Sequence, residues 1–403
     1  MIYKIMEDAQ SFDTFVENHP FCHFQKTSRW GDFNQKNYGV PYKLLGFYDE
    51  KQVLVATAMI LFRKTLFGTY LYIPKGPCVD YENQKLTIQV LTLLKEYTLH
   101  QNVMYMAIDP NVLRMEREID GKEVEGGQNN EWITKYIHQN GFVHRGYTYA
   151  YDGSFSNRFT LITDLTQDKQ ELYKGISTLR KRNIKKNAKV GLLTSEATRS
   201  ELSELSRLEA DLGKYKTVIK TQTNFYDHLY DSFQNHLHFY KTNLPMDKYI
   251  SFLEQKKESQ NENERKSAEK LLPIALDLKK KKGDNPIISV GLFLKAGKTT
   301  YTNYYFRDHD FDHLSPLDSL IFTGIENAIE EGCDTLDYLG FGGITEANDW
   351  DPGYPLYLYK HQWNSIYIED IGQFEFVLSP IRKKLSTIYT KVKRKIITKL
   401  SKK

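Results

Sequence analysis

The chain has 403 residues, of which 40% are hydrophobic and 26% are charged, and its formal net charge is +4. The composition is normal for a soluble globular protein, and the length indicates two domains. The three cysteines are scattered and form no CxxC pair, which excludes a disulfide or zinc framework and indicates a cytosolic protein. A membrane span and a signal peptide are also excluded, because the longest apolar run, 53–62, is about half a span and the first ten residues lack an apolar core.

The first 155 residues alternate helical and strand patterns, which predicts one α/β module. We expect helices at 8–18, 28–37, 81–100 and 132–138. We expect strands at 42–48, 52–62, 69–73 and 102–109, with a polar loop at 118–130.

The same alternation begins again near residue 158. We expect strands at 158–164, 287–294, 300–306 and 335–339. We expect helices at 177–188, 201–212, 224–236 and 317–331. The fold class predicted is therefore α/β (α+β), with two tandem domains of mixed sheets at 1–155 and 156–371.

A Lys/Glu/Gln-rich insertion at 246–285 interrupts the second module. Its sparse apolar positions fit either a projecting helical hairpin or a disordered loop, and we favour the hairpin. Pro273 is expected to mark a break or the start of its second helix.

The segment 379–403 carries ten Lys or Arg residues and no acid. Its apolar residues recur every three or four positions, which predicts a basic amphipathic helix. Such a helix suits an anionic membrane surface. The alternative is a helix that docks its apolar stripe on the protein and leaves its lysines in solvent.

The sequence "YIPKGPCVDY" at 72–81 places two prolines around a lysine and a glycine. Neither proline can continue a helix or pair within a central strand, so the segment is a rigid turn that carries Lys75. The turn is either a hinge or the lip of a binding site.

Five segments occur in one order: "FQKTSRW" (24–30), "YIPKGPCVDY" (72–81), "IDPNV" (108–112), "LDYLGFGG" (336–343) and "PLYLYKHQW" (355–363). Together they resemble the FemABX family of peptidoglycan aminoacyltransferases over nearly the whole chain. The resemblance implies two GNAT-like domains, a helical arm in the second domain that meets tRNA, and a return of 372–378 to the first.

The resemblance also implies the reaction, in which an aminoacyl group passes from aminoacyl-tRNA to the stem-peptide lysine of lipid II or UDP-MurNAc-pentapeptide. An activated ester needs positioning and oxyanion stabilisation but no covalent nucleophile, cofactor or metal. The run "RDHDFDH" at 307–313 is accordingly not expected to hold a metal.

The family's catalytic lysine follows an aromatic residue, and Tyr359 and Lys360 match that step. Asp109 matches a family aspartate considered as a general base, although Asp before Pro is also ordinary turn chemistry. Lys360 could instead be a surface lysine.

Further residues are implied in substrate binding. They are Lys36, Lys75, Lys220, Tyr226 and Tyr304. Lys36 stands two positions from the family's lysine, where this chain has Asn34, and Lys220 and Tyr226 stand for an Arg and Tyr pair whose arginine is missing. Core packing is the alternative for Tyr304.

The basic run 179–189 could bind the tRNA backbone, or it could be a solvated helix face. Its candidate tRNA contacts are Arg180, Lys181, Arg182, Lys185 and Lys186.

Two other functions remain open on sequence grounds. The first is a GNAT-like N-acyltransferase with another acyl donor, disfavoured because the pyrophosphate-binding loop of acetyl-CoA enzymes is missing. The second is a non-enzymatic RNA- or membrane-binding protein. The tRNA-dependent transferase, cytoplasmic and peripheral at the inner face of the cell membrane, is the preferred interpretation.

Overall fold

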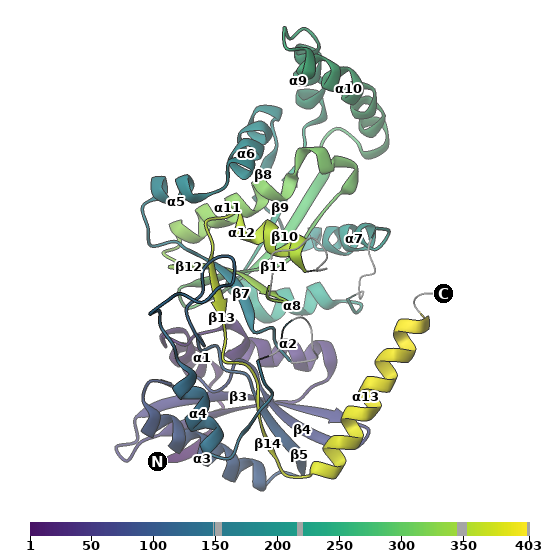
Figure 1. Ribbon diagram of the computed structural model, residues 1–403. Coiled ribbons are helices and arrows are strands. Elements are labelled where there is room, and N and C mark those ends of the chain that lie inside the picture. Colours follow the sequence, from purple (N-terminus) through teal and green to yellow (C-terminus); the bar gives the residue numbers. More distant parts are fainter. Residues whose placement is uncertain (148, 150–154, 216–220, 345–352, 401–403) are drawn as a thin grey trace. The chain divides into compact units, whose positions relative to one another are not determined.

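Figure 1 shows the computed structural model, which describes residues 1–147, 149, 155–215, 221–344 and 353–400. Side chains in the last range are described as far as 390 and at 392. The chain divides into two compact units. The first comprises Met1–Leu161, Gly340–Leu358 and Ile366–Lys403, and the second comprises Ile162–Leu339 and Tyr359–Ser365. The expected boundary at 155/156 is close to this division, but 340–358 and 366–371 group with the first unit rather than the second.

The first unit is built on a seven-stranded sheet of order β1-β2-β3-β4-β5-β14-β6. The strands are β1 (Ile2–Ile5), β2 (Tyr42–Tyr48), β3 (Leu54–Thr65), β4 (Gly68–Ile73), β5 (Val103–Ile108), β6 (Val143–His144) and β14 (Phe374–Val377). β4 and β5 are parallel, whereas β14 runs antiparallel to both β5 and β6, so a late segment of the chain completes the sheet.

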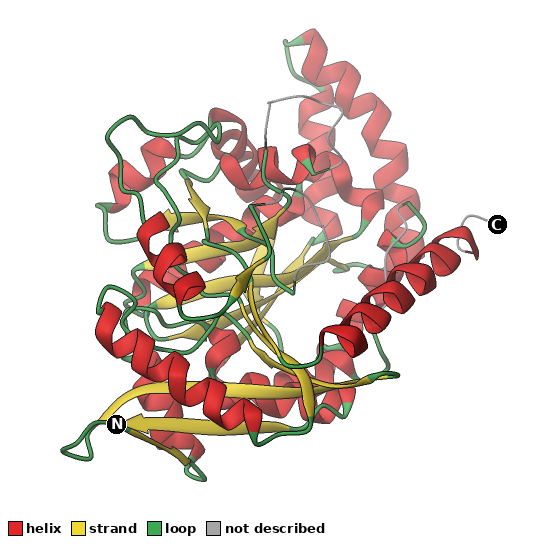
Figure 2. Ribbon diagram, turned by 60° about the horizontal axis from the view of Figure 1, so that its bottom comes forward, coloured by secondary structure: helices red, strands yellow, loops and turns green. Residues whose placement is uncertain are grey.

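Helices cover both faces of this sheet (Figure 2). They are α1 (Ala9–Glu17), α2 (Ser28–Tyr38), α3 (Gln84–Leu99) and α4 (Glu131–Gln139), and α13 (Pro380–Leu400) belongs to the same unit. Strand residues alternate between two cores because successive side chains point to opposite faces. Leu45, for example, joins the core under α3 and α4, while Leu44 joins the core under α1.

The second sheet has the order β13-β7-β12-β11-β10-β9-β8. Its strands are β7 (Phe159–Asp164), β8 (Leu193–Glu196), β9 (Leu237–Asn243), β10 (Ile287–Ala296), β11 (Thr299–Arg307), β12 (Thr335–Phe341) and β13 (Ile366–Glu369). β11 and β12 are parallel, and β8 to β11 pair as antiparallel neighbours, so this sheet is also mixed.

The helices of the second half of the chain are α5 (Lys169–Gly175), α6 (Thr178–Val190), α7 (Ser203–Leu212), α8 (Phe225–Phe233), α9 (Met246–Lys257), α10 (Glu262–Lys282), α11 (Pro316–Glu330) and α12 (Tyr354–His361). Short 3-10 turns lie at Phe24–Lys26, Arg199–Glu201, Gln234–His236 and His309–Leu314. The basic helix α6 begins where the Ser177 hydroxyl accepts a hydrogen bond from the Arg180 amide, and it ends at Gly191 with φ of 90°. Both are standard helix-end chemistry.

The insertion forms a helical hairpin of α9 and α10 (Figure 1). Its two helices share an apolar core that includes Tyr249, Leu253, Ala268 and Leu278. Pro273 lies inside α10 and does not break it, contrary to our expectation. It is exposed, so water can bind the backbone carbonyl four residues earlier that the proline leaves without a donor.

Two α/β units with mixed sheets and an inserted helical hairpin are the fold class that the sequence predicts, and that prediction is confirmed. None of the described helices combines the length and the apolarity that crossing a bilayer requires.

Candidate functional site

Lys360 is a buried lysine near the end of α12, with only 3% of its surface exposed. Its ammonium donates a hydrogen bond of 2.8 Å to the Leu339 carbonyl. Burial lowers the pKa of Lys360 to about 8, although nearby Asp337 favours the charged form. The lysine is therefore mostly protonated at neutral pH and close to its titration, as groups at reaction centres often are.

The carbonyl that binds this ammonium belongs to a strained residue. Leu339 has a φ of 58°, a left-handed conformation that bulky residues rarely adopt. The Asp337 carboxylate holds it there by accepting a hydrogen bond of 2.6 Å from the Leu339 amide. Residues kept in such conformations concentrate at functional sites. The strained backbone at Leu339 therefore supports a functional role for the lysine that its carbonyl binds.

Tyr359 lies beneath the guanidinium of Arg180, which is 4.4 Å from its ring centre. Arg180 in turn forms two hydrogen bonds, of 2.9 and 3.0 Å, with the buried carboxylate of Asp318. Asn183 also donates to Asp318, at 2.8 Å. Arg180 is consequently fixed inside the protein, and the expected contact between Arg180 and a tRNA phosphate does not fit its position.

The Tyr359 hydroxyl has no hydrogen-bond partner within the described part of the chain. Burial raises the pKa of this phenol well above its ordinary value, so it stays protonated and can donate. A buried hydroxyl without a partner is costly unless a ligand supplies one. Tyr359 and Lys360 thus offer two donors from adjacent positions on α12.

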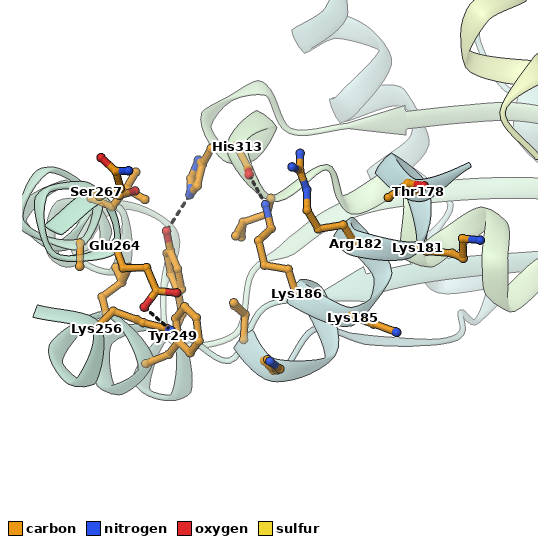
Figure 3. A pocket seen from close by; sticks show the side chains of 18 of the residues that line it. Thr178, Lys181, Arg182, Lys185, Lys186, Tyr249, Lys256, Glu264, Ser267 and His313 are labelled. Atoms are coloured by element: carbon orange, nitrogen blue, oxygen red, sulfur yellow. Dashed lines mark hydrogen bonds and ion pairs between the residues drawn. The ribbon is translucent and has the colours of Figure 1, made fainter. Parts of the chain in front are cut away.

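A groove of about 1170 Å³ lies between α6 and the hairpin of α9 and α10 (Figure 3). Lys181, Arg182, Lys185 and Lys186, all predicted tRNA contacts, line it. Lys186 is partly engaged, since its ammonium donates to the His313 carbonyl at 2.6 Å. Arg182 and Lys185 form no ion pair with any residue that the structure describes.

The two sides of this groove differ in chemistry. The side formed by the hairpin supplies apolar and aromatic residues, which include Tyr249, Phe252 and Leu271. Cations from α5, α6 and α9 far outnumber the one carboxylate in the lining, Glu264, which Lys256 neutralises at 2.7 Å. A polyanion with flat apolar groups matches such a surface, because phosphates meet the cations and bases meet the aromatic rings.

In the first unit, the Pro74–Lys75 turn is tightly held. The Gly76 amide bonds the Ile73 carbonyl at 3.0 Å and Lys75 has a φ of 57°, which fits a type II turn. The Lys75 ammonium pairs with Asp370 at 2.9 Å. Lys75 therefore fastens the turn to a segment far along the chain, and this geometry favours a structural role for it over a phosphate contact.

Asp109 lies against the same turn and is buried. It accepts hydrogen bonds from the Tyr72 hydroxyl at 2.8 Å and from the Lys75 amide at 2.7 Å. Burial raises its pKa, an effect that Lys75 opposes. Because both oxygens already accept bonds, Asp109 supports the turn more readily than it could remove a substrate proton.

The remaining predicted substrate residues are dispersed. Tyr226 and Tyr304 do meet, with ring centres 5.7 Å apart, but Tyr226 is a core residue and Tyr304 is half-buried. Lys36 is exposed and pairs with Asp32 one turn earlier on α2. Lys220 lies outside the described residues.

The run 307–313 has its carboxylates occupied by cations. Lys282 pairs with Asp308 at 2.6 Å and with Asp310 at 2.5 Å, and Arg307 pairs with Asp312. Within the described residues there is no group of three or more side chains positioned to hold a metal.

Comparison with known proteins resolves the family. The family model described as FemAB matches residues 8–391. The chain belongs to the FemAB family. It is 24% identical to aminoacyltransferase FemA of Staphylococcus aureus strain bovine RF122 / ET3-1, over 96% of this chain and 97% of that protein, and equally identical to FemA of strain MRSA252. The crystal structure of FemX matches with a TM-score of 0.79 at 20% identity, over 96% of this chain and 99% of that one.

The protein is accordingly an aminoacyltransferase of peptidoglycan synthesis, and the resemblance inferred from the five sequence segments is confirmed. Two parts of the Lys360 surroundings are not predictable from the sequence. No sequence motif marks Asp318, and nothing in "LDYLGFGG" indicates that Leu339 adopts a left-handed conformation.

Proposed function

We propose that this FemAB enzyme transfers an aminoacyl group from aminoacyl-tRNA to the side-chain amine of the stem-peptide lysine in lipid II. The supporting observation is the position of α6. Its first turn carries Arg180 against Tyr359, next to Lys360, and the rest of the helix lines the cationic groove. One ligand could thus hold its reactive end at Lys360 and its polyanionic body along α6.

In this proposal the acceptor nitrogen attacks the carbonyl carbon of the ester that joins the amino acid to the tRNA ribose. A C–N bond forms, the C–O ester bond breaks, and the ribose oxygen leaves with the proton that the amine loses. The protonated Lys360 stabilises negative charge on the tetrahedral oxygen or on the departing ribose oxygen. The Tyr359 hydroxyl donates a second hydrogen bond to the same region.

The pH profile of the reaction tests the protonation state of Lys360. The acceptor lysine must be neutral, so kcat/KM should rise with pH toward the acceptor's pKa of about 10.4. The charge on Lys360 is lost above its pKa of about 8. We expect the wild-type profile to rise tenfold per pH unit up to about pH 8 and then to level off, because the two titrations cancel.

Lys360→Arg provides the control, since a guanidinium stays charged throughout this range. Its absolute rate should be lower, but its profile should continue to rise beyond pH 8. Ester hydrolysis measured without enzyme is subtracted at every pH. If both proteins level off at the same pH, Lys360 is not the group that titrates.

The groove cations are tested by Lys185→Glu/Lys189→Glu, a double change in exposed residues of the α6 face. We expect KM for aminoacyl-tRNA to rise about tenfold in 0.1 M salt with kcat nearly unchanged. The dependence of log KM on log salt should also become shallower, by roughly 0.9 for each phosphate that the variant no longer neutralises. Initial rates over a range of salt concentrations measure both effects.

Lys270→Glu/Lys280→Glu is the matched control. It makes the same charge change at exposed positions of α10 that do not line the groove. Equal effects from the two double variants would mean that general charge, rather than the groove, attracts the tRNA.

The acceptor is tested with lipid II in vesicles and with the soluble UDP-linked precursor. Our proposal is that the enzyme is cytoplasmic and works at the inner face of the cell membrane, supported by the ten cations and no acid within 379–403. Transfer of labelled amino acid from charged tRNA to lipid II should exceed transfer to the UDP-linked form. Transfer from an acyl-CoA alone would instead support a GNAT-like N-acyltransferase.

A further inference from the structure

The amphipathic helix α13 turns its apolar side away from the first unit. Ile381, Leu385, Ile388 and Val392 fall within a narrow arc, since each residue advances 100° around a helix. They are 76%, 46%, 50% and 49% exposed, respectively. The arrangement is the reverse of that in a surface helix whose apolar stripe faces the core.

The opposite side of α13 is attached to the first unit, and three of its side chains make polar contacts there. Arg382 donates to the Phe67 carbonyl at 2.9 Å, and Lys383 pairs with the buried carboxylate of Glu375. Ser386, which is buried, lies 3.4 Å from the Thr65 hydroxyl. The anchored side of α13 thus lies opposite its exposed apolar residues.

A further exposed apolar residue lies in a turn that contacts α13. The turn between β3 and β4 contains Leu66, whose side chain is 73% exposed. The neighbouring Phe67 packs edge-on against Tyr389 of α13, with ring centres 5.9 Å apart. The turn and the helix are therefore joined, and both carry exposed apolar residues.

We propose that α13 and the Leu66 turn together form a docking surface for an anionic lipid bilayer, with the apolar arc of α13 inserted among the lipids. Charge selects this occupant. The segment 379–403 has ten cations and no acid, so a second copy of the same face would be repelled, whereas anionic headgroups would be attracted. The inference builds on the proposed lipid-linked acceptor and adds how the enzyme holds the surface on which that acceptor lies.

Binding to vesicles tests the surface without any substrate. We expect the full-length protein to sediment with vesicles of equal phosphatidylglycerol and phosphatidylcholine, and to bind pure phosphatidylcholine far more weakly. Leu385→Glu/Ile388→Glu should lower partitioning to the anionic vesicles about tenfold or more, because the apolar arc can no longer insert. Leu66→Glu should lower it several-fold.

Thr387→Glu/Thr390→Glu is the matched control, since it adds the same charge to α13 at exposed positions outside the apolar arc. It should weaken vesicle binding much less than Leu385→Glu/Ile388→Glu. Transfer to the soluble precursor should be unchanged in all these variants, which separates a failed docking surface from a failed assignment of the reaction.

Three results would overturn the proposal. One is equal vesicle binding by the wild type and Leu385→Glu/Ile388→Glu. Another is an equal loss in the two double variants, which would indicate attraction by charge alone. The third is a protein that does not bind vesicles but forms a concentration-dependent dimer. Analytical ultracentrifugation would detect this dimer, and Leu385→Glu/Ile388→Glu would abolish it.

Discussion

Lys360→Met should reduce kcat about 10²–10³-fold, which corresponds to roughly 3–4 kcal/mol of transition-state stabilisation. Methionine keeps the unbranched apolar stem in the buried site and removes the ammonium that bonds the Leu339 carbonyl. Negative charge develops mainly in the transition state, so binding of tRNA and precursor should change little. Single-turnover rates with saturating enzyme measure the chemical step directly.

Two companion measurements make this result specific. Circular dichroism should show that the variant is folded, and filter binding should show a Kd for charged tRNA within a few-fold of the wild type. A normal kcat would remove Lys360 from the catalytic machinery, while a raised KM alone would recast it as a substrate-binding residue.

Glu369→Gln should destabilise the first unit by roughly 3–5 kcal/mol, the usual cost of breaking a buried ion pair from one side. Glu369 has no exposed surface and bonds three arginines. They are Arg114, Arg117 and Arg158, at 2.9, 2.5 and 2.8 Å. The neutral amide would leave these guanidinium groups without their shared countercharge. The midpoint of urea unfolding, followed by tryptophan fluorescence, reports the loss.

Glu131→Gln is the control for this change. Glu131 also pairs with Arg114, but it is partly exposed, so its loss should cost less than about 1 kcal/mol. Equal shifts in the two variants would contradict the role assigned to the buried carboxylate.

The stability conferred by Glu369 should also depend on pH. Burial alone would raise its pKa, but hydrogen bonds from Arg158, Arg114 and Arg117 outweigh burial and lower the pKa below the ordinary 4.5. A depressed pKa means that the stabilisation is complete above the unfolded-state pKa and is lost as the pH falls through the folded-state pKa. The difference in stability between wild type and Glu369→Gln should therefore be full at neutral pH and shrink in acid.

Periodicity is sufficient to predict the longer elements. The strand expected at 42–48 coincides with β2. The helix expected at 81–100 exceeds α3 by three residues at its start, where the Asn83 side chain caps the helix, and by His100 at its end. Short elements carry too few residues for a period to be visible, which is why β1 and α5 are not predicted. β9 escapes prediction for a related reason, since its seven residues mix buried and polar side chains without strict alternation.

The site is less accessible to prediction because its contacts join residues that are distant in sequence. The step "YK" at 359–360 can be matched to a family motif, but the position of the Arg180 guanidinium depends on its bond to Asp318, which is 138 positions away. By sequence alone the lysine in the Pro74–Lys75 turn is available for a substrate, whereas in the fold it pairs with Asp370, 295 positions later. Residue type indicates what a side chain can bind, whereas only the folded structure decides whether that capacity is already used.

Helix α6 also sets a length scale for the substrate. Its 13 residues rise about 18 Å from first to last, because each step along an α-helix advances 1.5 Å. A donor that reaches both ends of α6 must be at least that long, which corresponds to about five steps between stacked nucleotides at 3.4 Å per step. The enzyme would thereby select its donor by length. A free aminoacyl nucleotide could reach Tyr359 and Lys360 but could not extend along α6, so the size of the carrier becomes part of substrate selection.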